Sequence, residues 1–168
     1  GERGIFNREA SVKQAAKNGR RETCYEFGTN PCSEIILRPN QFCNLSEVVI
    51  RATDGLEDIA RKVRVATILG TIQSTYTNFP YLRKVWTTNT EAERLLGVSL
   101  TGIMDNPLMT MDNEGLSDTL EYLKDVAVTT NADWADRLSI PAATAISCVK
   151  PSGTVSQLVD SASGIHAR

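Results

Sequence analysis

The order of apolar and polar residues along the chain predicts helices and strands in alternation. In five stretches apolar residues recur at intervals of three and four, which places them on one face of a helix. The expected helices cover residues 7–18, 54–78, 90–97, 114–137 and 155–162. Asp54 with Glu57, and Thr90 with Glu93, have the spacing of capping boxes that begin helices. Gly97 is placed to end the helix that Thr90 begins.

Other stretches lack helical spacing and have the composition of strands. The expected strands are residues 42–50, 98–103 and 144–149, and residues 22–28 also look extended. Pro31 and Pro39 fall in segments that we expect to be loops, because a residue before proline is disfavoured in helices. Strands that alternate with helices along a chain predict an α/β fold.

Length and composition limit the protein classes. The chain has 168 residues, 41% of them hydrophobic and 23% charged, as expected for one globular domain. Its net charge of −2, with both signs mixed along the chain, favours neither nucleic acid nor a membrane as a partner. No apolar run is as long as a membrane span, and no signal-peptide pattern opens the chain. We therefore expect a cytoplasmic location and reduced cysteines.

The segment around Cys32 carries the first candidate chemistry. Asn30, Cys32 and Glu34 alternate with Pro31 and Ser33, and in an extended segment residues two apart point to the same side. A carboxylate beside a thiol raises the pKa of the thiol, which speaks against an ordinary thiolate nucleophile. The pattern is compatible with a protonated thiol that loses its hydrogen as an atom, with Glu34 as a general base. The alternative is a surface loop that happens to contain a cysteine.

The remaining cysteines are interpreted by their surroundings. Cys43 lies eleven residues after Cys32, so it could reach the same pocket and supply electrons by forming a disulfide. Its other interpretation is a small buried residue at the start of a strand, and Cys24 and Cys148 fit that description better. Because the intervals between cysteines are eight, eleven and 105 residues, we expect no zinc site or other metal.

The sequence KPSGT joins an expected strand to an expected helix. A phosphate group could be bound by the backbone N–H groups of such a turn and by the hydroxyls of Ser152 and Thr154. Gly153 gives the turn flexibility, and Pro151 precedes these residues. The spacing is not that of a P-loop. Many strand-to-helix turns contain serine and glycine, so the motif alone does not identify a site.

Taken in order, three motifs resemble the large catalytic chain of ribonucleotide reductases. They are Asn-Pro-Cys-x-Glu at 30–34, Cys-Asn-Leu at 43–45 and Pro-Ser-Gly-Thr at 151–154. The eleven-residue interval from Cys32 to Cys43 and the flanking sequences GIFNREA, ERLLGVSLTGIMD and SGIHAR are most similar to the class II, adenosylcobalamin-dependent branch. The similarity runs over essentially all 168 residues.

That resemblance implies a fold and a place in a longer protein. The chain would be the central catalytic segment, residues 1–168, of a ten-stranded α/β barrel, with the Asn-Pro-Cys-x-Glu motif at the tip of a central finger loop. The chain opens without Met and stops at GIHAR without a polar tail, which also suggests a fragment. With part of the barrel absent, the isolated segment is expected to be inactive.

The resemblance also implies a role for each matched residue. Cys32 would become a transient thiyl radical that takes the 3′-hydrogen of the ribose, and Glu34 would accept the 3′-hydroxyl proton. Asn30 would hydrogen-bond the ribose hydroxyls, and Cys43 would be one of two thiols that reduce the 2′ carbon. The substrate phosphates would be held by the four residues Pro151, Ser152, Gly153 and Thr154.

The implied cofactor is adenosylcobalamin, because side chains alone do not generate such a radical. The implied partners are a ribonucleotide, a dithiol reductant such as thioredoxin, and the remainder of the parent chain, including the second redox cysteine. One alternative is a class I large subunit, which receives its radical from a separate metal-containing subunit. Another is a non-catalytic fragment that binds nucleotide phosphates. The sequence leaves open whether diphosphates or triphosphates are reduced.

Overall fold

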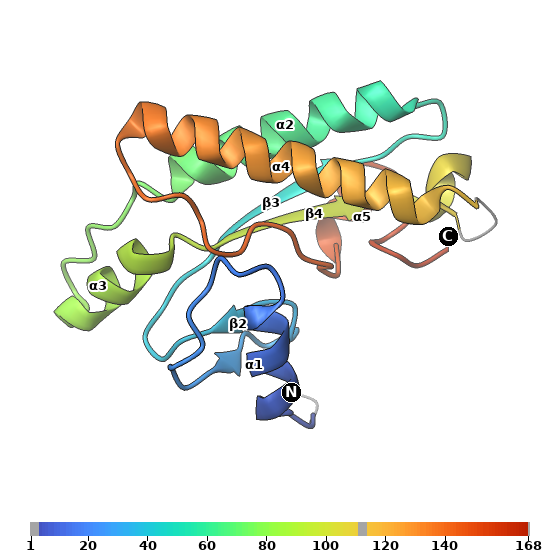
Figure 1. The fold of residues 1–168 in the computed structure, drawn as a ribbon. Coiled ribbons are helices and arrows are strands. Elements are labelled where there is room, and N and C mark those ends of the chain that lie inside the picture. Colours follow the sequence, from blue (N-terminus) through green and yellow to red (C-terminus); the bar gives the residue numbers. More distant parts are fainter. Residues whose placement is uncertain (1–3, 111–113, 168) are drawn as a thin grey trace.

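The computed structural model describes residues 4–110 and 114–167 (Figure 1). Residues 1–3, 111–113 and 168, which include the last residue of SGIHAR, lie outside the described part. The helices are α1 (Arg8–Ala16), α2 (Leu56–Gln73), α3 (Lys84–Glu93), α4 (Leu116–Leu138) and α5 (Thr154–Leu158). The strands are β1 (Gly28–Thr29), β2 (Ile36–Leu37), β3 (Asn44–Val49) and β4 (Leu96–Thr101). A mixed helix-and-strand fold is thereby confirmed.

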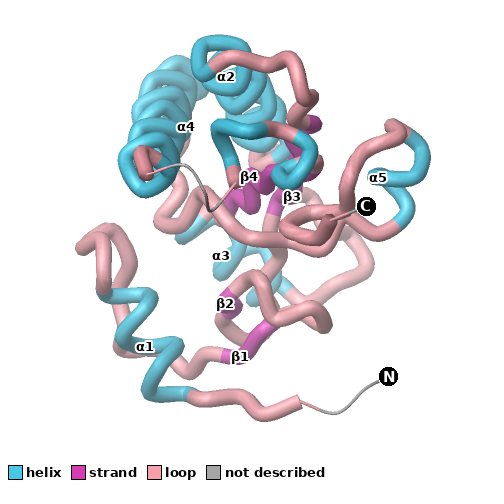
Figure 2. The backbone as a smooth tube through the Cα atoms, turned by 90° about the vertical axis from the view of Figure 1, so that its right-hand side faces the viewer, coloured by secondary structure: helices cyan, strands magenta, loops and turns pink. Residues whose placement is uncertain are grey.

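The centre of the fold is the parallel pair of β3 and β4. Their register runs from Asn44 opposite Leu96 to Val49 opposite Thr101. Parallel neighbours need a long crossover connection, and α2 and α3 provide it. Helices α2 and α4 lie side by side over one face of the pair, and the antiparallel hairpin of β1 and β2 lies with α1 on the other side (Figures 1 and 2).

The hydrophobic core fills the space between the two long helices and the parallel strands. Its buried members include Val48, Ile50, Ile59, Ala60, Val63, Leu96, Val98, Leu123, Ala127 and Ile146. Gly70 of α2 faces the sheet, where a Cβ atom would make an ordinary van der Waals contact, at 3.5 Å, with the side chain of Leu96. Burial of this apolar surface is the main term that stabilises the layers.

Several predicted elements are confirmed with small shifts at their ends. β3 lies within the expected strand 42–50, and α1, α2 and α4 lie close to the expected helices. The first cap of α2 is displaced by one residue: Gly55 is the N-cap, and the carboxylate of Asp58 accepts its N–H at 3.2 Å. Of the described helices, none is long and apolar enough to cross a bilayer.

The expected helix 90–97 is wrong. Thr90 and Glu93 stand in the last turn of α3, and Gly97 lies inside β4. Arg94 adopts a left-handed conformation, with φ of 42°, and ends the helix before the strand begins. The carboxylate of Glu93 is bound by Arg21 instead of a helix N-terminus, so a tertiary contact accounts for the residue that looked like a cap.

The expected strand 144–149 survives only as one parallel bridge, between Ser147 and Val98. The N–H groups of Leu96 and Val98, two residues apart, donate to the carbonyls of Ala145 and Ile146, which are adjacent. A regular ladder would advance by two residues on both sides, so the pairing is irregular in the manner of a bulge. The segment nevertheless follows β4 along its free edge.

Three further boundaries differ from the prediction. β4 begins and ends two residues earlier than the expected strand 98–103. In the extended-looking segment 22–28, only Gly28 belongs to a strand. The expected helix 155–162 is limited to the five residues of α5, after which Asp160 takes a left-handed conformation with φ of 48°.

Candidate active site

The Asn-Pro-Cys-x-Glu motif forms the turn of the β1–β2 hairpin. The N–H of Ser33 donates to the carbonyl of Asn30 at 3.0 Å, and the N–H of Ile35 donates to the side-chain Oδ1 of Asn30, also at 3.0 Å. Ser33 has a left-handed φ of 62°, and Pro31 begins the turn. The loop expected at Pro31 is therefore confirmed, but its backbone turns instead of staying extended, so simple alternation does not decide where the side chains of residues 30–34 point.

The turn nevertheless separates the motif into an exposed and a buried part. Cys32 is exposed at the tip of the turn. The side chain of Glu34 points inward and is only 1% exposed, and the side chain of Asn30 lies close to it. The structure thus brings Asn30 and Glu34 together directly, with Cys32 two residues away in the chain.

Lys150 contacts Glu34 and was not predicted as a site residue. Its Nζ donates to Oε1 of Glu34 at 2.6 Å, across 116 residues of chain. Burial alone would raise the pKa of Glu34, but the hydrogen bond from Lys150 and the nearby polar groups of the backbone and Asn30 outweigh it and lower that pKa. The contact with Glu34 raises the pKa of Lys150 in turn. A signal was present in the sequence, since Lys150 directly precedes the Pro-Ser-Gly-Thr motif.

Two thiols lie close to this ion pair. Burial, followed by the charge of Glu34, raises the pKa of Cys43. Burial and the charges of Glu34 and Cys43 raise the pKa of Cys148 to about 12. The expectation that Cys148 is core is wrong, since it is half-buried and lies near Cys43 and Glu34. Both thiols are therefore held in the protonated form at neutral pH.

A glycine makes room for these side chains on the sheet. A Cβ atom on Gly97 would lie 2.4 Å from Cδ2 of Leu45, 3.1 Å from Cδ1 of Ile35 and 3.2 Å from Sγ of Cys148. Gly97 therefore lets the hairpin and Cys148 approach the surface of β4. Cys24, by contrast, is exposed, and its expected burial is wrong; its Sγ lies 3.9 Å from a carboxylate oxygen of Glu22.

The KPSGT turn meets the hairpin through Lys150. The N–H of Lys150 donates to Oγ of Ser99 at 3.0 Å, which fixes the start of the turn on β4. Ser152 is buried, and its hydroxyl has no hydrogen-bond partner within residues 4–110 and 114–167. Gly153 adopts φ of 56° and ψ of −125°, a conformation that favours glycine. Gly164 packs against the turn, since its Cβ would lie 3.2 Å from the carbonyl of Lys150.

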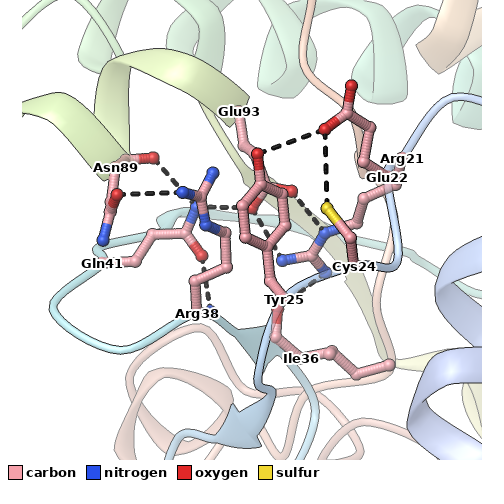
Figure 3. Close-up of polar contacts among 9 residues, drawn as sticks. All are labelled: Arg21, Glu22, Cys24, Tyr25, Ile36, Arg38, Gln41, Asn89 and Glu93. Atoms are coloured by element: carbon pink, nitrogen blue, oxygen red, sulfur yellow. Dashed lines mark hydrogen bonds and ion pairs between the residues drawn. The ribbon is translucent and has the colours of Figure 1, made fainter.

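A buried ion pair holds the base of the hairpin (Figure 3). Nε and Nη2 of Arg21 donate to the two carboxylate oxygens of Glu93, each at 2.8 Å, and Nη1 donates to the carbonyl of Ile36 at 2.9 Å. Nε2 of Gln41 donates to Oε2 of Glu93 at 2.5 Å. The pair connects the N-terminal segment, β2 and the end of α3, so it fixes the hairpin relative to the sheet.

A second set of contacts extends this network toward Asn89 (Figure 3). Asn89 accepts from Nη2 of Arg38 at 3.0 Å and donates to the carbonyl of Pro39 at 2.8 Å. The guanidinium of Arg38 also lies 3.6 Å from the ring centroid of Tyr25. These contacts tie the segment after β2 to α3, whereas the turn at residues 30–34 is held at its Glu34 end by Lys150.

Comparison with known proteins identifies related chains. No family model matches the chain. It is 28% identical, over 99% of its length, to an adenosylcobalamin-dependent ribonucleoside-triphosphate reductase of Levilactobacillus brevis, and 30% identical over the same share to one of Lactobacillus gasseri. A probable enzyme of the same name from Dictyostelium discoideum is 29% identical over 83% of the chain. The chain spans 26%, 26% and 18% of these three relatives.

A solved structure has the same fold. The crystal structure of a B12-dependent, class II ribonucleotide reductase superposes with a TM-score of 0.64 at 24% identity, covering 89% of this chain and 23% of the other. The sequence relatives and this likeness agree with the resemblance that the ordered motifs gave. Over nearly its whole length, the chain is similar to about one quarter of the adenosylcobalamin-dependent ribonucleoside-triphosphate reductases that it matches.

Proposed function

We propose that the chain is the central catalytic segment of a class II ribonucleotide reductase, which reduces ribonucleotides to deoxyribonucleotides. The observation that carries this proposal is the clustering of Glu34 with Asn30, Cys43 and Lys150 behind the Cys32 turn. The names of the sequence relatives support the reaction. Because those relatives are triphosphate reductases, we infer that ribonucleoside triphosphates are the substrates.

The proposed residue roles are those that the motif match implies. Cys32, as a thiyl radical, takes the 3′-hydrogen of the ribose, and the ionised Glu34 accepts the 3′-hydroxyl proton. Asn30 hydrogen-bonds the ribose hydroxyls. The pKa of Glu34 lies below its ordinary value, so the carboxylate is ionised at neutral pH and able to accept a proton.

The redox balance requires two thiols. As the 2′ C–O bond breaks and water leaves, Cys43 and a second cysteine from outside this chain give up two hydrogens and form a disulfide. A dithiol reductant such as thioredoxin then returns the disulfide to two thiols. The raised pKa of Cys43 keeps it protonated, so it carries the hydrogen that this step consumes.

Adenosylcobalamin is the proposed cofactor, as it is for the sequence relatives. When bound, it supplies the radical chemistry that side chains lack. The exposed thiol of Cys32 fits this role, since a partner group can reach it at the tip of the turn. A radical there must be shielded from water during turnover, so we infer that the rest of the parent protein encloses the turn.

The remaining assignments concern the substrate phosphates and the parent fold. We propose that the turn of Pro151, Ser152, Gly153 and Thr154 holds the phosphates, a role supported by the unpartnered hydroxyl of Ser152. We further propose that β3 and β4 belong to a ten-stranded α/β barrel, with residues 30–34 as its finger loop. The proposed setting is the cytoplasm.

The experiment uses the full-length protein that contains this segment. Deoxyribonucleotide formation from each ribonucleoside triphosphate is measured with a dithiol reductant, with and without adenosylcobalamin. Cys32→Ala is compared with Cys24→Ala, which removes an exposed thiol outside the cluster. We expect product only with adenosylcobalamin, no product from Cys32→Ala, and near-normal product from Cys24→Ala.

Other results would change the proposal in defined ways. Product without adenosylcobalamin would indicate class I chemistry and a separate radical-generating subunit. Absence of product from every ribonucleotide, with the protein folded, would refute the enzyme and favour a module that binds nucleotide phosphates. Full activity of Cys32→Ala would refute the role of the thiyl radical at this position.

A further inference from the structure

The ion pair between Glu34 and Lys150 is asymmetric in its exposure to solvent. The carboxylate side chain is 1% exposed, whereas the lysine side chain is 31% exposed. A buried carboxylate is costly unless a cation or hydrogen-bond donors compensate it. Lys150 is the cation in contact with Glu34, at 2.6 Å, and it satisfies only one of the two carboxylate oxygens.

The other oxygen of Glu34 is buried and unused. Oε2 has no hydrogen-bond partner in the part of the chain that the structure describes. Buried carboxylate oxygens are normally hydrogen-bonded, because an unsatisfied one loses its interaction with water and gains nothing. An orphaned acceptor in a cluster with thiols and a lysine therefore points to a donor from a bound ligand.

Lys150 is held in a way that fixes how far its ammonium group can reach. Its backbone N–H is bound to the hydroxyl of Ser99 on β4, and its carbonyl is packed against Gly164. Lys150 thus joins the sheet to the hairpin turn. The contact with Oε1 orients the carboxylate, because the two oxygens of one carboxylate are rigidly related and fixing one fixes the other.

The other ionisable groups near Glu34 do not substitute for Lys150. Cys43 and Cys148 interact with the carboxylate from the sheet, and Cys32 interacts with Lys150 from the turn. All three are thiols, so none supplies a positive charge. Arg21 lines the same hollow as Glu34, but its guanidinium is committed to Glu93. Arg20 also lines that hollow, but among the described residues the ion pair of Glu34 is with Lys150.

We propose that Lys150 is a positioning residue: it binds Oε1 of Glu34 and thereby presents the free Oε2, ionised, to a hydroxyl of the bound ribonucleotide. This inference rests on the proposed function and assigns a role that the motif match does not give. Lys150 acts through Glu34 and not on the reacting atoms. Its position at the start of the KPSGT turn, directly before Pro151, places it between the base and the proposed phosphate site.

The test compares Lys150→Met, Lys150→Arg and wild type in the full-length protein. First, the ionisation of Glu34 is followed by infrared difference spectroscopy, as the carboxylate signal that Glu34→Gln removes. We expect Lys150→Met to raise the pKa of Glu34, because burial is then no longer opposed by the ammonium group. Lys150→Arg should restore a low value. Lys62→Met, which breaks the ion pair with Asp54 at 2.5 Å, is the matched control and should leave Glu34 unchanged.

Second, the pH dependence of deoxyribonucleotide formation is measured for the same proteins. In Lys150→Met the acid limb of kcat/KM should move to higher pH, and a shift of one unit lowers kcat/KM by about tenfold below both pKa values. The loss should fall on kcat, and Lys150→Arg should recover most of it. A residue with only a structural role would lower activity evenly and leave the acid limb in place.

Defined results would overturn the inference. An unchanged ionisation of Glu34 in folded Lys150→Met would overturn it, whether or not the enzyme is active. A raised KM with unchanged kcat and an unshifted acid limb would reassign Lys150 to binding the phosphates. If wild type makes no deoxyribonucleotide, the proposed function fails, and the presentation of Oε2 to a ribose fails with it. The infrared measurement decides separately whether Lys150 controls the charge of Glu34.

Discussion

The buried pair of Arg21 and Glu93 should be the most sensitive polar contact for stability. Their side chains are 3% and 4% exposed, and the guanidinium contacts both carboxylate oxygens at 2.8 Å. The substitution Glu93→Gln keeps the size of the side chain and removes its charge. Arg21 then remains buried as an uncompensated cation, and its geometry with Ile36 leaves it little freedom to reach water.

The size of the effect can be bounded. Breaking a buried ion pair by removing one partner costs about 3–5 kcal/mol, because the remaining charge stays desolvated. Gln retains one acceptor oxygen, so we expect a loss of about 3 kcal/mol in the free energy of unfolding. The double variant Arg21→Met with Glu93→Leu removes both charges, and it should be much closer to wild type than Glu93→Gln alone.

The assay is urea unfolding of the 168-residue chain, followed by fluorescence of its two tryptophans. Glu26→Gln is the matched control, because Glu26 pairs with Arg8 at 3.6 Å while both side chains are more than half exposed. That exposed pair should contribute less than about 1 kcal/mol. A loss below about 1 kcal/mol for Glu93→Gln, or a double variant less stable than the single one, would refute the reasoning.

Three further predictions concern packing, a thiol and pH. Gly97→Ala should lower the free energy of unfolding by about 1–3 kcal/mol, because the added Cβ would overlap the side chain of Leu45. Gly28→Ala, whose Cβ would meet nothing within 4 Å, is the control in the same urea assay, and equal urea midpoints of the two variants would contradict the predicted overlap. Cys148, with a pKa of about 12, should react with iodoacetamide at pH 8 roughly a hundredfold more slowly than the exposed Cys24. The two rates are measured by mass spectrometry of the modified peptides, and equal rates would show that the Cys148 thiol is not protected. The pKa values of Glu34 and Asp54 are lowered in the folded chain, so the stability that these two carboxylates contribute is present above their ordinary pKa values of 4.5 and 3.8 and is lost as pH falls through the lowered values. Urea midpoints measured from pH 7 to pH 2 should therefore fall at the acid end, and Lys62→Met should reduce the part of this fall that is due to Asp54. Identical acid profiles of the variant and wild type would exclude this linkage.

The sequence predicts the parts of this fold that depend on local pattern. The long helices α2 and α4 and the strand β3 have strong periodicity, so their existence could be predicted and only their ends moved. Thr90 and Glu93 show where this approach fails. Their spacing is that of a capping box, yet Glu93 is bound by Arg21, 72 residues away in the chain. Local spacing cannot reveal a partner at that separation.

For the site, the motif match predicts Asn30, Cys32, Glu34 and Cys43 as functional residues, but alternation does not predict their backbone, because a turn reverses the chain at Pro31–Ser33. The lysine was missed, since its role depends on a contact across 116 residues. Cys148 was assigned to the core because its neighbours are apolar, whereas the irregular pairing of residues 144–148 with β4 leaves it beside Gly97.

The two long-range ion pairs have complementary effects on the hairpin. Arg21 and Glu93 hold its base on α3, and Lys150 with Glu34 holds its turn on the sheet. The first pair is buried on both sides and has little access to water, so it should respond weakly to salt and substrate. The second has a partly exposed lysine at the start of the KPSGT turn, so it should respond more strongly to salt than the first. The base of the hairpin is thus suited to fix its position, and the Glu34 end is suited to present its carboxylate to a bound nucleotide.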